Sequence, residues 1–141
     1  MPEVTSLVIV GDGEEREHLE ALAGPKTHFK GSMGTEGVRA QMREADILVM
    51  NSTHEGVPMT ILEAMGMGMP IISTEVGGIA AVAPFGTVAE RTDGTVESIK
   101  KAVRIVADCY AERSAAAYAN SADFNFRAVN RKIYGYLEAH H

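Results

Sequence analysis

Three things that the sequence lacks exclude whole classes of protein. It has one cysteine in 141 residues, Cys109, so it can form no internal disulfide and nothing indicates an oxidising compartment. Lys and Arg number 13 against 19 Asp and Glu, and the net charge of −6 argues against a nucleic-acid-binding surface. No apolar run is long enough for a membrane span or a signal peptide. We therefore expect a cytoplasmic protein with no nucleic-acid partner and no transmembrane segment.

What the sequence does contain is ordinary globular composition. Hydrophobic residues make up 45% of the chain and charged residues 23%, without a low-complexity tract. A length of 141 residues falls within the roughly 100 to 200 residues that are typical of one domain. We therefore predict a single folded domain over residues 1–141, large enough to bury a core.

Short apolar segments alternate with stretches of helical periodicity along the chain. The segment "SLVIV" is continuous, apolar and rich in β-branched residues, as expected for a strand buried on both faces. The expected strands are residues 6–10, 27–31, 46–51, 70–74 and, more weakly, 86–90. The expected helices are residues 14–24, 35–45, 58–68 and 96–110, then two further stretches, of which the last carries Phe126, Val129, Ile133 and Leu137. This alternation predicts an α/β fold with a doubly wound parallel sheet of about five strands and helices on both faces.

Ligands of such sheets bind beyond the carboxyl ends of the strands. The candidate turns are therefore residues 11–14, 30–34, 51–59 and 74–79.

The stretch "HEGVPMTILEAMG", residues 54–66, carries the most chemistry. Pro58 suits the first position of a helix, so the N–H groups that follow it lack partners inside the helix and can hold an anion such as phosphate. Gly56 lets the backbone approach a ligand closely. Glu55 precedes the helix, and Glu63 lies about one and a half turns into it. Two carboxylates facing one crevice would accept hydrogen bonds from hydroxyls on either side of a phosphate, the layout of a sugar nucleotide.

Plainer explanations stay open for these residues. A glutamate near a helix start is common because it interacts favourably with the helix dipole, and Glu63 could be a solvated surface residue. A lone histidine in a polar loop, such as His54, is more often solvated than in contact with a ligand. The segment "GDGEER" does not match the G-x-G-x-x-G fingerprint because Arg16 stands at the third glycine, which disfavours a nicotinamide enzyme.

The segment "EGVPMTILEAMGMGMPIISTEVGG", residues 55–78, resembles the E-G-x-P-x-x-x-L-E-A-M-x-x-G-x-P signature of glycosyltransferase family 4. These are retaining GT-B enzymes that use nucleotide sugars. The segments "LVIVGDGEEREHLEALA", "THFKGSMGTEGVRAQMREADILVMNS" and "DFNFRAVNRKIYGYLEA" are similar to other family segments in the same order, so the resemblance covers Leu7 to about Leu137. It implies the Rossmann-like C-terminal domain of a GT-B glycosyltransferase.

The resemblance also implies roles for the matched residues. Glu55 corresponds to a catalytic-site glutamate at the donor sugar, and Glu63 to a glutamate that accepts hydrogen bonds from the donor's ribose. The residues whose backbone would contact the sugar and β-phosphate are Gly56, Val57, Pro58, Met59, Thr60 and Ile61. The loop that would hold the nucleobase consists of Lys30, Gly31, Ser32 and Met33. Because retaining transfer in this family is metal-independent, we expect no metal and no cofactor besides the nucleotide diphosphate sugar, which is the donor substrate.

The sequence departs from the family pattern in three places. The acceptor-binding domain has no counterpart here, and neither do the strand and helix whose arginine and lysine bind the diphosphate. That strand is central in the order 3-2-1-4-5-6, so its neighbours must pair directly or another segment must fill the gap. We therefore predict a non-family strand arrangement or an oligomer formed through unpaired backbone. Finally, "GGIAAVA" stands where the family has "GGxPE", and Ala81 replaces a carboxylate.

Two functional hypotheses follow. The first is the donor-binding half of a retaining glycosyltransferase, which transfers a sugar from a nucleotide diphosphate sugar to an acceptor. It would be inactive alone and would work with an acceptor-domain chain or by self-association. The alternative is a non-catalytic binding or assembly module derived from a glycosyltransferase. The retained Glu55 and Glu63 favour the first, the missing basic pair favours the second, and whether the single chain is an enzyme stays open.

Overall fold

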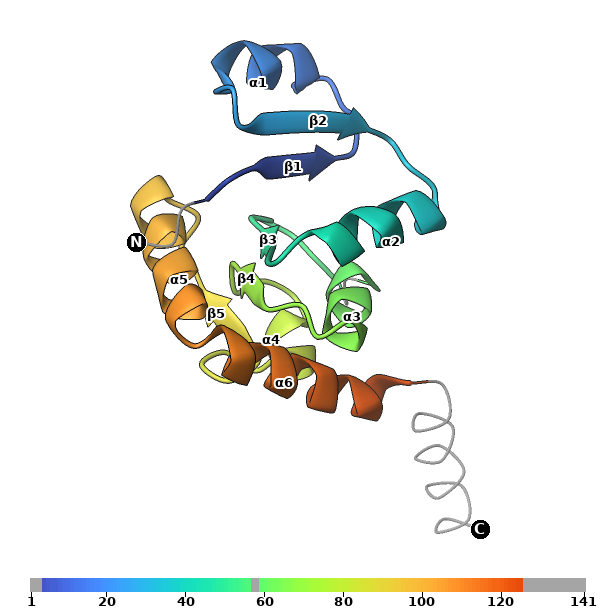
Figure 1. The fold of residues 1–141 in the computed structure, drawn as a ribbon, viewed down its shortest axis with the longest axis vertical. Coiled ribbons are helices and arrows are strands. Elements are labelled where there is room, and N and C mark those ends of the chain that lie inside the picture. The colour runs from blue at the N-terminus through green and yellow to red at the C-terminus, as the bar shows by residue number, and fades with distance from the viewer. Residues whose placement is uncertain (1–3, 57–58, 126–141) are drawn as a thin grey trace, which may run out of the picture. The chain divides into compact units, whose positions relative to one another are not determined.

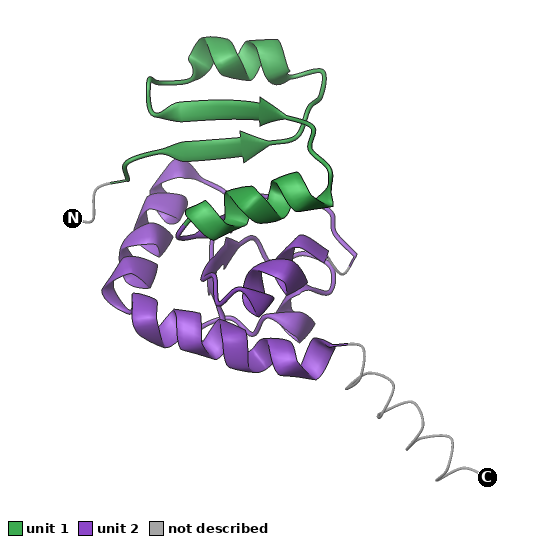
Figure 2. Cartoon of the chain, turned by 45° about the vertical axis from the view of Figure 1, so that its right-hand side comes forward, with its two compact units in different colours: residues 1–45 green, residues 46–141 purple. Residues whose placement is uncertain are grey.

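The computed structural model describes residues 4–56 and 59–125 of the chain. Strands and helices alternate along them (Figure 1), and the chain divides into two compact units, residues 1–45 and 46–141 (Figure 2). The expected last helix and the residues Val57 and Pro58 lie outside the described residues.

Unit 1 is a parallel strand pair with two helices. Its elements are β1 (Leu7–Val10), α1 (Arg16–Leu22), β2 (Thr27–Gly31) and α2 (Thr35–Glu44). The two strands pair in parallel from Leu7 opposite Thr27 to Val10 opposite Gly31, with a register shift after Ile9. At the start of α1, Arg16 forms ion pairs with Glu20 at 2.8 Å and with Asp12 at 3.2 Å. Arg16 thereby connects Asp12, in the turn after β1, to Glu20 in α1.

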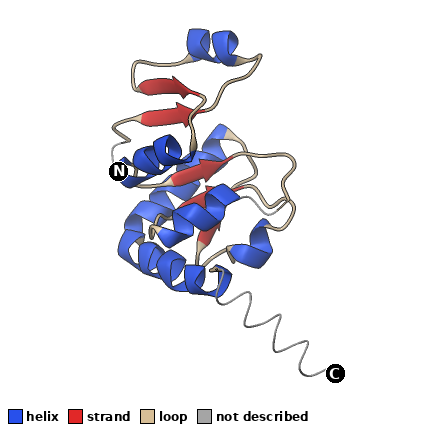
Figure 3. Cartoon of the chain, turned by 90° about the vertical axis from the view of Figure 1, so that its right-hand side faces the viewer, coloured by secondary structure: helices blue, strands red, loops and turns tan. Residues whose placement is uncertain are grey.

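Unit 2 contains a parallel three-stranded sheet in the order β3-β4-β5. Its elements are β3 (Leu48–Met50), α3 (Met59–Gly66), β4 (Ile71–Ser73), α4 (Ile79–Val82), β5 (Ala89–Arg91), α5 (Val96–Asp108), α6 (Tyr110–Ser121) and the short 3₁₀ helix η1 (Ala122–Phe124). The last residues of the three strands, Met50, Ser73 and Arg91, are register partners. The loops that follow them therefore leave the sheet from one edge (Figure 3).

The core of unit 2 lies around the central strand. All three residues of β4 are fully buried, as expected for a strand covered on both faces. Ile72 packs with Ala102 and Val106 of α5, flanked by Ile47 and Val103. The buried residues of α3 are Ile61, Ala64 and Met65.

A buried ion pair ties α6 to β5. The guanidinium of Arg113 donates to the Glu90 carboxylate at 2.7 Å and to the carbonyl of Ala89 at 3.1 Å. Its side chain is only 9% exposed, so this charge depends on its partners for compensation. α6 is thereby fixed to the sheet by polar contacts.

The predicted α/β class is confirmed, because the strand pairs are parallel and helices lie on both sides. All five expected strands form. Most boundaries differ by one or two residues, as where the helix expected over 96–110 ends at Asp108, and the largest difference is that β5 begins at Ala89 rather than at residue 86. The four-residue helix α4 was not expected.

The strand pairing bears on the prediction about the missing central strand. The described strands form two ladders, β1-β2 in unit 1 and β3-β4-β5 in unit 2. Direct pairing of the neighbours, filling of the gap by another segment and formation of an oligomer all stay predictions.

No helix in the described part of the chain is both long and apolar enough to cross a membrane.

Candidate functional site

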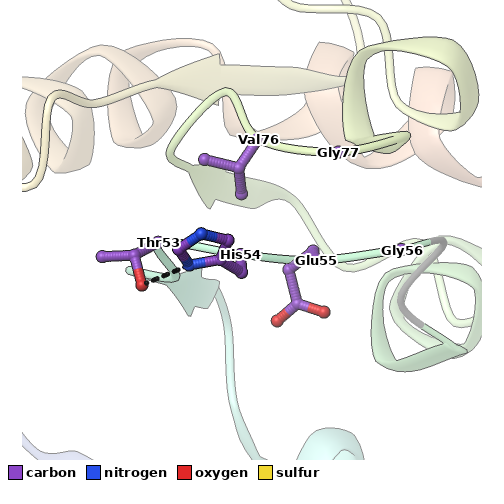
Figure 4. Close-up of a pocket in the computed structure, with 6 residues that line it drawn as sticks. All are labelled: Thr53, His54, Glu55, Gly56, Val76 and Gly77. Atoms are coloured by element: carbon purple, nitrogen blue, oxygen red, sulfur yellow. Dashed lines mark hydrogen bonds between the residues drawn. The ribbon is translucent and has the colours of Figure 1, made fainter.

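Two neighbouring pockets lie at the carboxyl ends of the strands of unit 2. The first has a volume of about 590 Å³ and is lined by Thr53, His54, Glu55, Gly56, Val76 and Gly77 (Figure 4). Its walls are the segment after β3 and the segment after β4, which are two of the four turns that the sequence singled out. The position is where α/β sheets bind their ligands.

Backbone contacts hold these two segments together. The N–H of Gly78 donates to the carbonyl of Gly56 at 2.9 Å, and the hydroxyl of Thr74 donates to the carbonyl of Ser52 at 2.6 Å. Gly77 has φ +55, and a Cβ built there would overlap the carbonyl oxygen of Glu55. Only glycine fits such a conformation and such a close approach of two backbones.

Glu55 supplies the carboxylate of the first pocket. Its side chain is half-buried, and the hydroxyl of Ser52 donates to its Oε1 at 2.7 Å. In Figure 4 the carboxylate points away from Val76, while the side chain of Val76 points toward the segment that carries Glu55. A carboxylate has about four lone-pair sites, so one hydroxyl contact leaves capacity for ligand hydroxyls. His54 is exposed, and its Nδ1 lies 3.2 Å from the Thr53 hydroxyl.

The second predicted glutamate, Glu63, is placed differently. It is half-buried on α3 and is not among the residues that line either pocket. Neither of these two pockets therefore contains both carboxylates. At the start of α3, Met59 is 67% exposed whereas the side chain of Ile61 is fully buried, so Ile61 can offer a ligand only its backbone.

The predicted nucleobase loop, residues 30–33, belongs to unit 1. Lys30 and Gly31 are the last two residues of β2, and Ser32 and Met33 follow the strand. Gly31 has φ +70, and its carbonyl accepts from the N–H of Gly11 at 2.8 Å. Lys30 and Ser32 are exposed, and Met33 is half-buried against Gly37. Two exposed side chains and a left-handed glycine make this a surface turn with accessible polar groups.

The second pocket was missed by the sequence analysis. It has a volume of about 610 Å³ and is lined by residues 51–53, 74–76 and 91–95, one segment from the end of each strand. The amide of Asn51 donates to the carbonyl of Gly94 at 3.3 Å, which ties the first segment to the third. Gly94, with φ +88, was the signal in the sequence, since an Asp-Gly pair directly after a strand marks a turn at the ligand edge.

The turn after β5 is built around Asp93. Its carboxylate accepts from the hydroxyl of Thr95 at 2.7 Å and from the Thr95 backbone N–H at 2.9 Å. These hydrogen bonds, first that from the hydroxyl, lower the pKa of Asp93 below its ordinary value of 3.8. The Thr95 hydroxyl in turn accepts from the N–H of Ser98 and caps α5. The carboxylate is thereby kept ionised at the rim of the second pocket.

Among the described residues, no three His, Cys, Asp or Glu side chains lie close enough together to hold a metal ion.

A parallel sheet with helices on both sides and two polar, glycine-flanked pockets at its carboxyl edge defines a Rossmann-like ligand-binding domain. The sequence model of the family glycosyl transferases group 1 matches residues 2–108. The chain belongs to this family.

Two curated relatives show the range of similarity. The chain is 31% identical over 110 residues to the 2-deoxystreptamine N-acetyl-D-glucosaminyltransferase of Streptomyces fradiae, an alignment that covers 68% of the chain and 26% of the enzyme. It is 32% identical over 79 residues to the sulfoquinovosyl transferase SQD2 of Arabidopsis thaliana, covering 55% of the chain and 16% of that protein. The aligned parts thus span about a quarter or less of these relatives.

Solved structures share the fold over nearly the whole chain. The sucrose-phosphate synthase of Thermosynechococcus elongatus superposes with a TM-score of 0.78 at 24% identity, covering 96% of this chain and 39% of that one. The Anabaena protein HepE in complex with UDP superposes with a TM-score of 0.80 at 21% identity, covering 98% of this chain and 42% of that one. At these identities the likeness concerns the fold.

Proposed function

We propose that this chain is the donor-binding half of a retaining glycosyltransferase of family 4 that uses a nucleotide diphosphate sugar. One observation carries the proposal: the half-buried Glu55, held by Ser52, lines a pocket at the carboxyl ends of β3 and β4. Support comes from the family membership and from relatives that transfer sugars. The Anabaena neighbour, with a TM-score above 0.7, was solved with UDP and with UDP-glucose.

The proposed reaction exchanges one bond at the anomeric carbon of the donor sugar. The bond from this carbon to the diphosphate oxygen breaks, and its electron pair leaves on the diphosphate. The hydroxyl oxygen of the acceptor bonds to the same carbon from the same face, and the hydroxyl proton passes to the departing diphosphate oxygen. Atoms and charge balance without a metal or a further cofactor, and the proposal includes neither.

Each part of the site has a task in this reaction. Glu55 accepts hydrogen bonds from hydroxyls of the donor sugar and orients it, and Glu63 does the same for the ribose. Backbone N–H groups at the start of α3 face the diphosphate and stabilise its developing charge. The loop of Lys30 to Met33 holds the nucleobase. Because the chain spans only part of its relatives, the proposal includes an acceptor-domain chain or self-association and no transfer by this chain alone.

The proposal keeps the cytoplasmic location expected from the single cysteine.

The test is calorimetric titration with UDP, GDP and ADP and their glucose conjugates, with and without EDTA. Glu55→Gln should weaken binding of the sugar conjugate but not of the free nucleotide, and Glu63→Gln should weaken both. A hydrogen bond to a charged group contributes about 1.5 to 3 kcal/mol, so each loss should be about ten- to hundredfold. Glu112→Gln, an exposed residue on α6 that lines neither pocket, is the control.

The outcomes separate the two hypotheses. Preferential binding of one base, with the expected pattern of losses and no effect of EDTA, supports the donor-binding function. If no nucleotide or conjugate binds at millimolar concentration, the assembly-module alternative takes its place. If Glu55→Gln binds the conjugates as well as the parent does, the assignment of Glu55 to the donor sugar is wrong.

A further inference from the structure

Glu55 is held by a short series of hydrogen bonds that begins at the end of β4. The hydroxyl of Thr74 donates to the backbone carbonyl of Ser52 at 2.6 Å, and the hydroxyl of Ser52 donates to Oε1 of Glu55 at 2.7 Å. The backbone N–H of Thr74 also donates to the carbonyl of Met50 at 3.1 Å. Thr74 therefore bonds through both its backbone and its side chain to β3 and the segment that follows it.

Burial within residues 51–56 follows these contacts. Ser52 and Glu55 are half-buried, whereas the other residues of that segment are exposed. Thr74 is half-buried as well, and Ser73, the residue before it, is fully buried at the end of the central strand. Because threonine is β-branched, its side chain has few rotamers and holds its hydroxyl in a defined direction. The series of hydrogen bonds thus starts from a fixed point at the edge of the sheet.

The contact with Ser52 leaves part of the Glu55 carboxylate available to a ligand. Among the described residues, Ser52 is the only hydrogen-bond partner of this carboxylate, and it occupies Oε1. Oε2 can therefore accept from a hydroxyl of a ligand in the first pocket. A glutamate side chain that a ligand must fix loses rotamer freedom, and this loss lowers the affinity. A side chain that is already held before the ligand arrives avoids most of that loss.

We propose that Ser52 and Thr74 are positioning residues for the donor sugar: Thr74 fixes the backbone at Ser52, and the Ser52 hydroxyl fixes the Glu55 carboxylate. This proposal rests on the proposed function, in which Glu55 accepts hydrogen bonds from hydroxyls of the sugar. It goes beyond that function because it makes sugar recognition depend on a hydroxyl at the end of β4, outside the segment that carries Glu55. Both residues act through Glu55 and need no contact of their own with the donor.

Calorimetric titration with UDP-glucose, GDP-glucose and ADP-glucose, and with the three free nucleotides, tests the proposal. Ser52→Ala should weaken binding of the glucose conjugate about three- to tenfold, with no comparable loss for the free nucleotide. Thr74→Val keeps the shape of the side chain but removes the hydroxyl, so it should cause a loss in the same direction. Ser52→Thr and Thr74→Ser retain the hydroxyls and should recover most of each loss.

Two matched controls remove hydroxyls that donate to carbonyl groups but line neither pocket. Ser121→Ala removes a hydrogen bond of 2.6 Å to the carbonyl of Tyr118, and Thr87→Val removes one of 3.2 Å to the carbonyl of Pro84. Both should bind every probe as the parent does. Amide spectra without ligand show which variants are folded, and Thr74→Val tests the same series of hydrogen bonds from its other end if Ser52→Ala is not.

A double-mutant cycle shows whether Ser52 and Thr74 act through Glu55. In a Glu55→Ala background, Ser52→Ala and Thr74→Val should cause no further loss of conjugate affinity, because no carboxylate is left to position. A loss as large as in the parent background would overturn the proposal, since the hydroxyls would then support the pocket in some other way. Equal losses for the conjugate and the free nucleotide would overturn it as well.

The side-chain order of Glu55 in the chain without ligand distinguishes failure of this inference from failure of the proposed function. Relaxation of isotope-labelled glutamate side chains should show Glu55 ordered in the parent and in Ser121→Ala, and more mobile in Ser52→Ala. If this difference appears but no nucleotide or conjugate binds, the positioning of Glu55 stands and the donor-binding function fails. If conjugates bind through Glu55 but Ser52→Ala changes neither its mobility nor the affinity, the positioning fails and the donor-binding function stands.

Discussion

Replacing Gly77 by alanine tests the close contact that shapes the first pocket. A Cβ at Gly77 would overlap the carbonyl oxygen of Glu55 and lie 2.6 Å from its carbonyl carbon and 3.0 Å from the carbonyl oxygen of Gly56. Carbon to oxygen contacts normally measure about 3.3 to 3.6 Å, so one segment must move by roughly 1 to 2 Å. All three atoms belong to the backbone, so no change of rotamer can relieve the overlap.

Gly86→Ala is the matched control. Gly86 has φ +86, and a Cβ there meets nothing within 4 Å, so it has the conformational cost without the overlap. That cost is about 1 to 2 kcal/mol for an L-residue in the left-handed region. Gly77→Ala should lose in addition the hydrogen bond from Gly78 to Gly56, worth about 1 kcal/mol, and gain strain. We expect Gly77→Ala to be the less stable variant by about 1 to 3 kcal/mol.

Urea unfolding gives the stability difference, and nucleotide-sugar titration gives its consequence for the site. Movement of the segment displaces Glu55, so Gly77→Ala should bind the conjugate at least about tenfold more weakly, a loss of about 1.4 kcal/mol. Gly86→Ala should bind it as the parent does. Equal destabilisation of the two variants would refute the close approach of the backbones, and unchanged binding by Gly77→Ala would refute its role in the pocket.

Two further predictions concern charged groups. Arg113→Met removes the buried guanidinium that pairs with the half-buried carboxylate of Glu90 and should lower the free energy of unfolding by about 3 kcal/mol in urea titrations. Lys100→Met breaks the exposed ion pair with Glu97 and should change the free energy of unfolding by less than about 1 kcal/mol. Equal effects of the two substitutions would contradict the stabilising role of the buried Arg113. The hydrogen bonds from Thr95 lower the pKa of Asp93, so its ionised form stabilises the fold above pH 3.8, and this is lost as the pH falls through the lowered pKa. The stability difference between the parent and Asp93→Asn should therefore be present at pH 7 and shrink below about pH 4 in thermal unfolding, and a difference that stays constant with pH would contradict it.

The sequence predicted those elements that are determined by the apolar pattern of their own residues. β4 was found because three consecutive apolar or small residues between glycine-rich turns are buried on both faces. The start of β5 was wrong because the segment before Ala89 turns back on itself: the N–H groups of Val88 and Ala89 both bond to the carbonyl of Pro84. The end of α5 was wrong because Cys109 leaves helical geometry, with φ −123 and ψ 33, which no proline or glycine signals.

One wall of the first pocket was predictable because residues 53–56 lie on one continuous stretch. Glu55, Gly56 and the start of α3 follow one strand, so local chemistry was enough to propose an anion and sugar site there. The placement of Glu63 outside both pockets was not predictable, because it depends on how α3 is rotated against its neighbours. The helical period gives the angle between two side chains but not the direction in which either faces.

The second pocket required strand order as well as strand positions. Each of its three segments is an ordinary polar turn, and none carries a ligand motif by itself. Parallel pairing aligns Met50, Ser73 and Arg91, so the turns that follow them meet at one edge of the sheet. That register brings residues 51, 74 and 94 together although they are far apart in sequence. A prediction that had combined the five strand positions with the order β3-β4-β5 would have found this pocket, because the chemistry of each turn was already visible in the sequence.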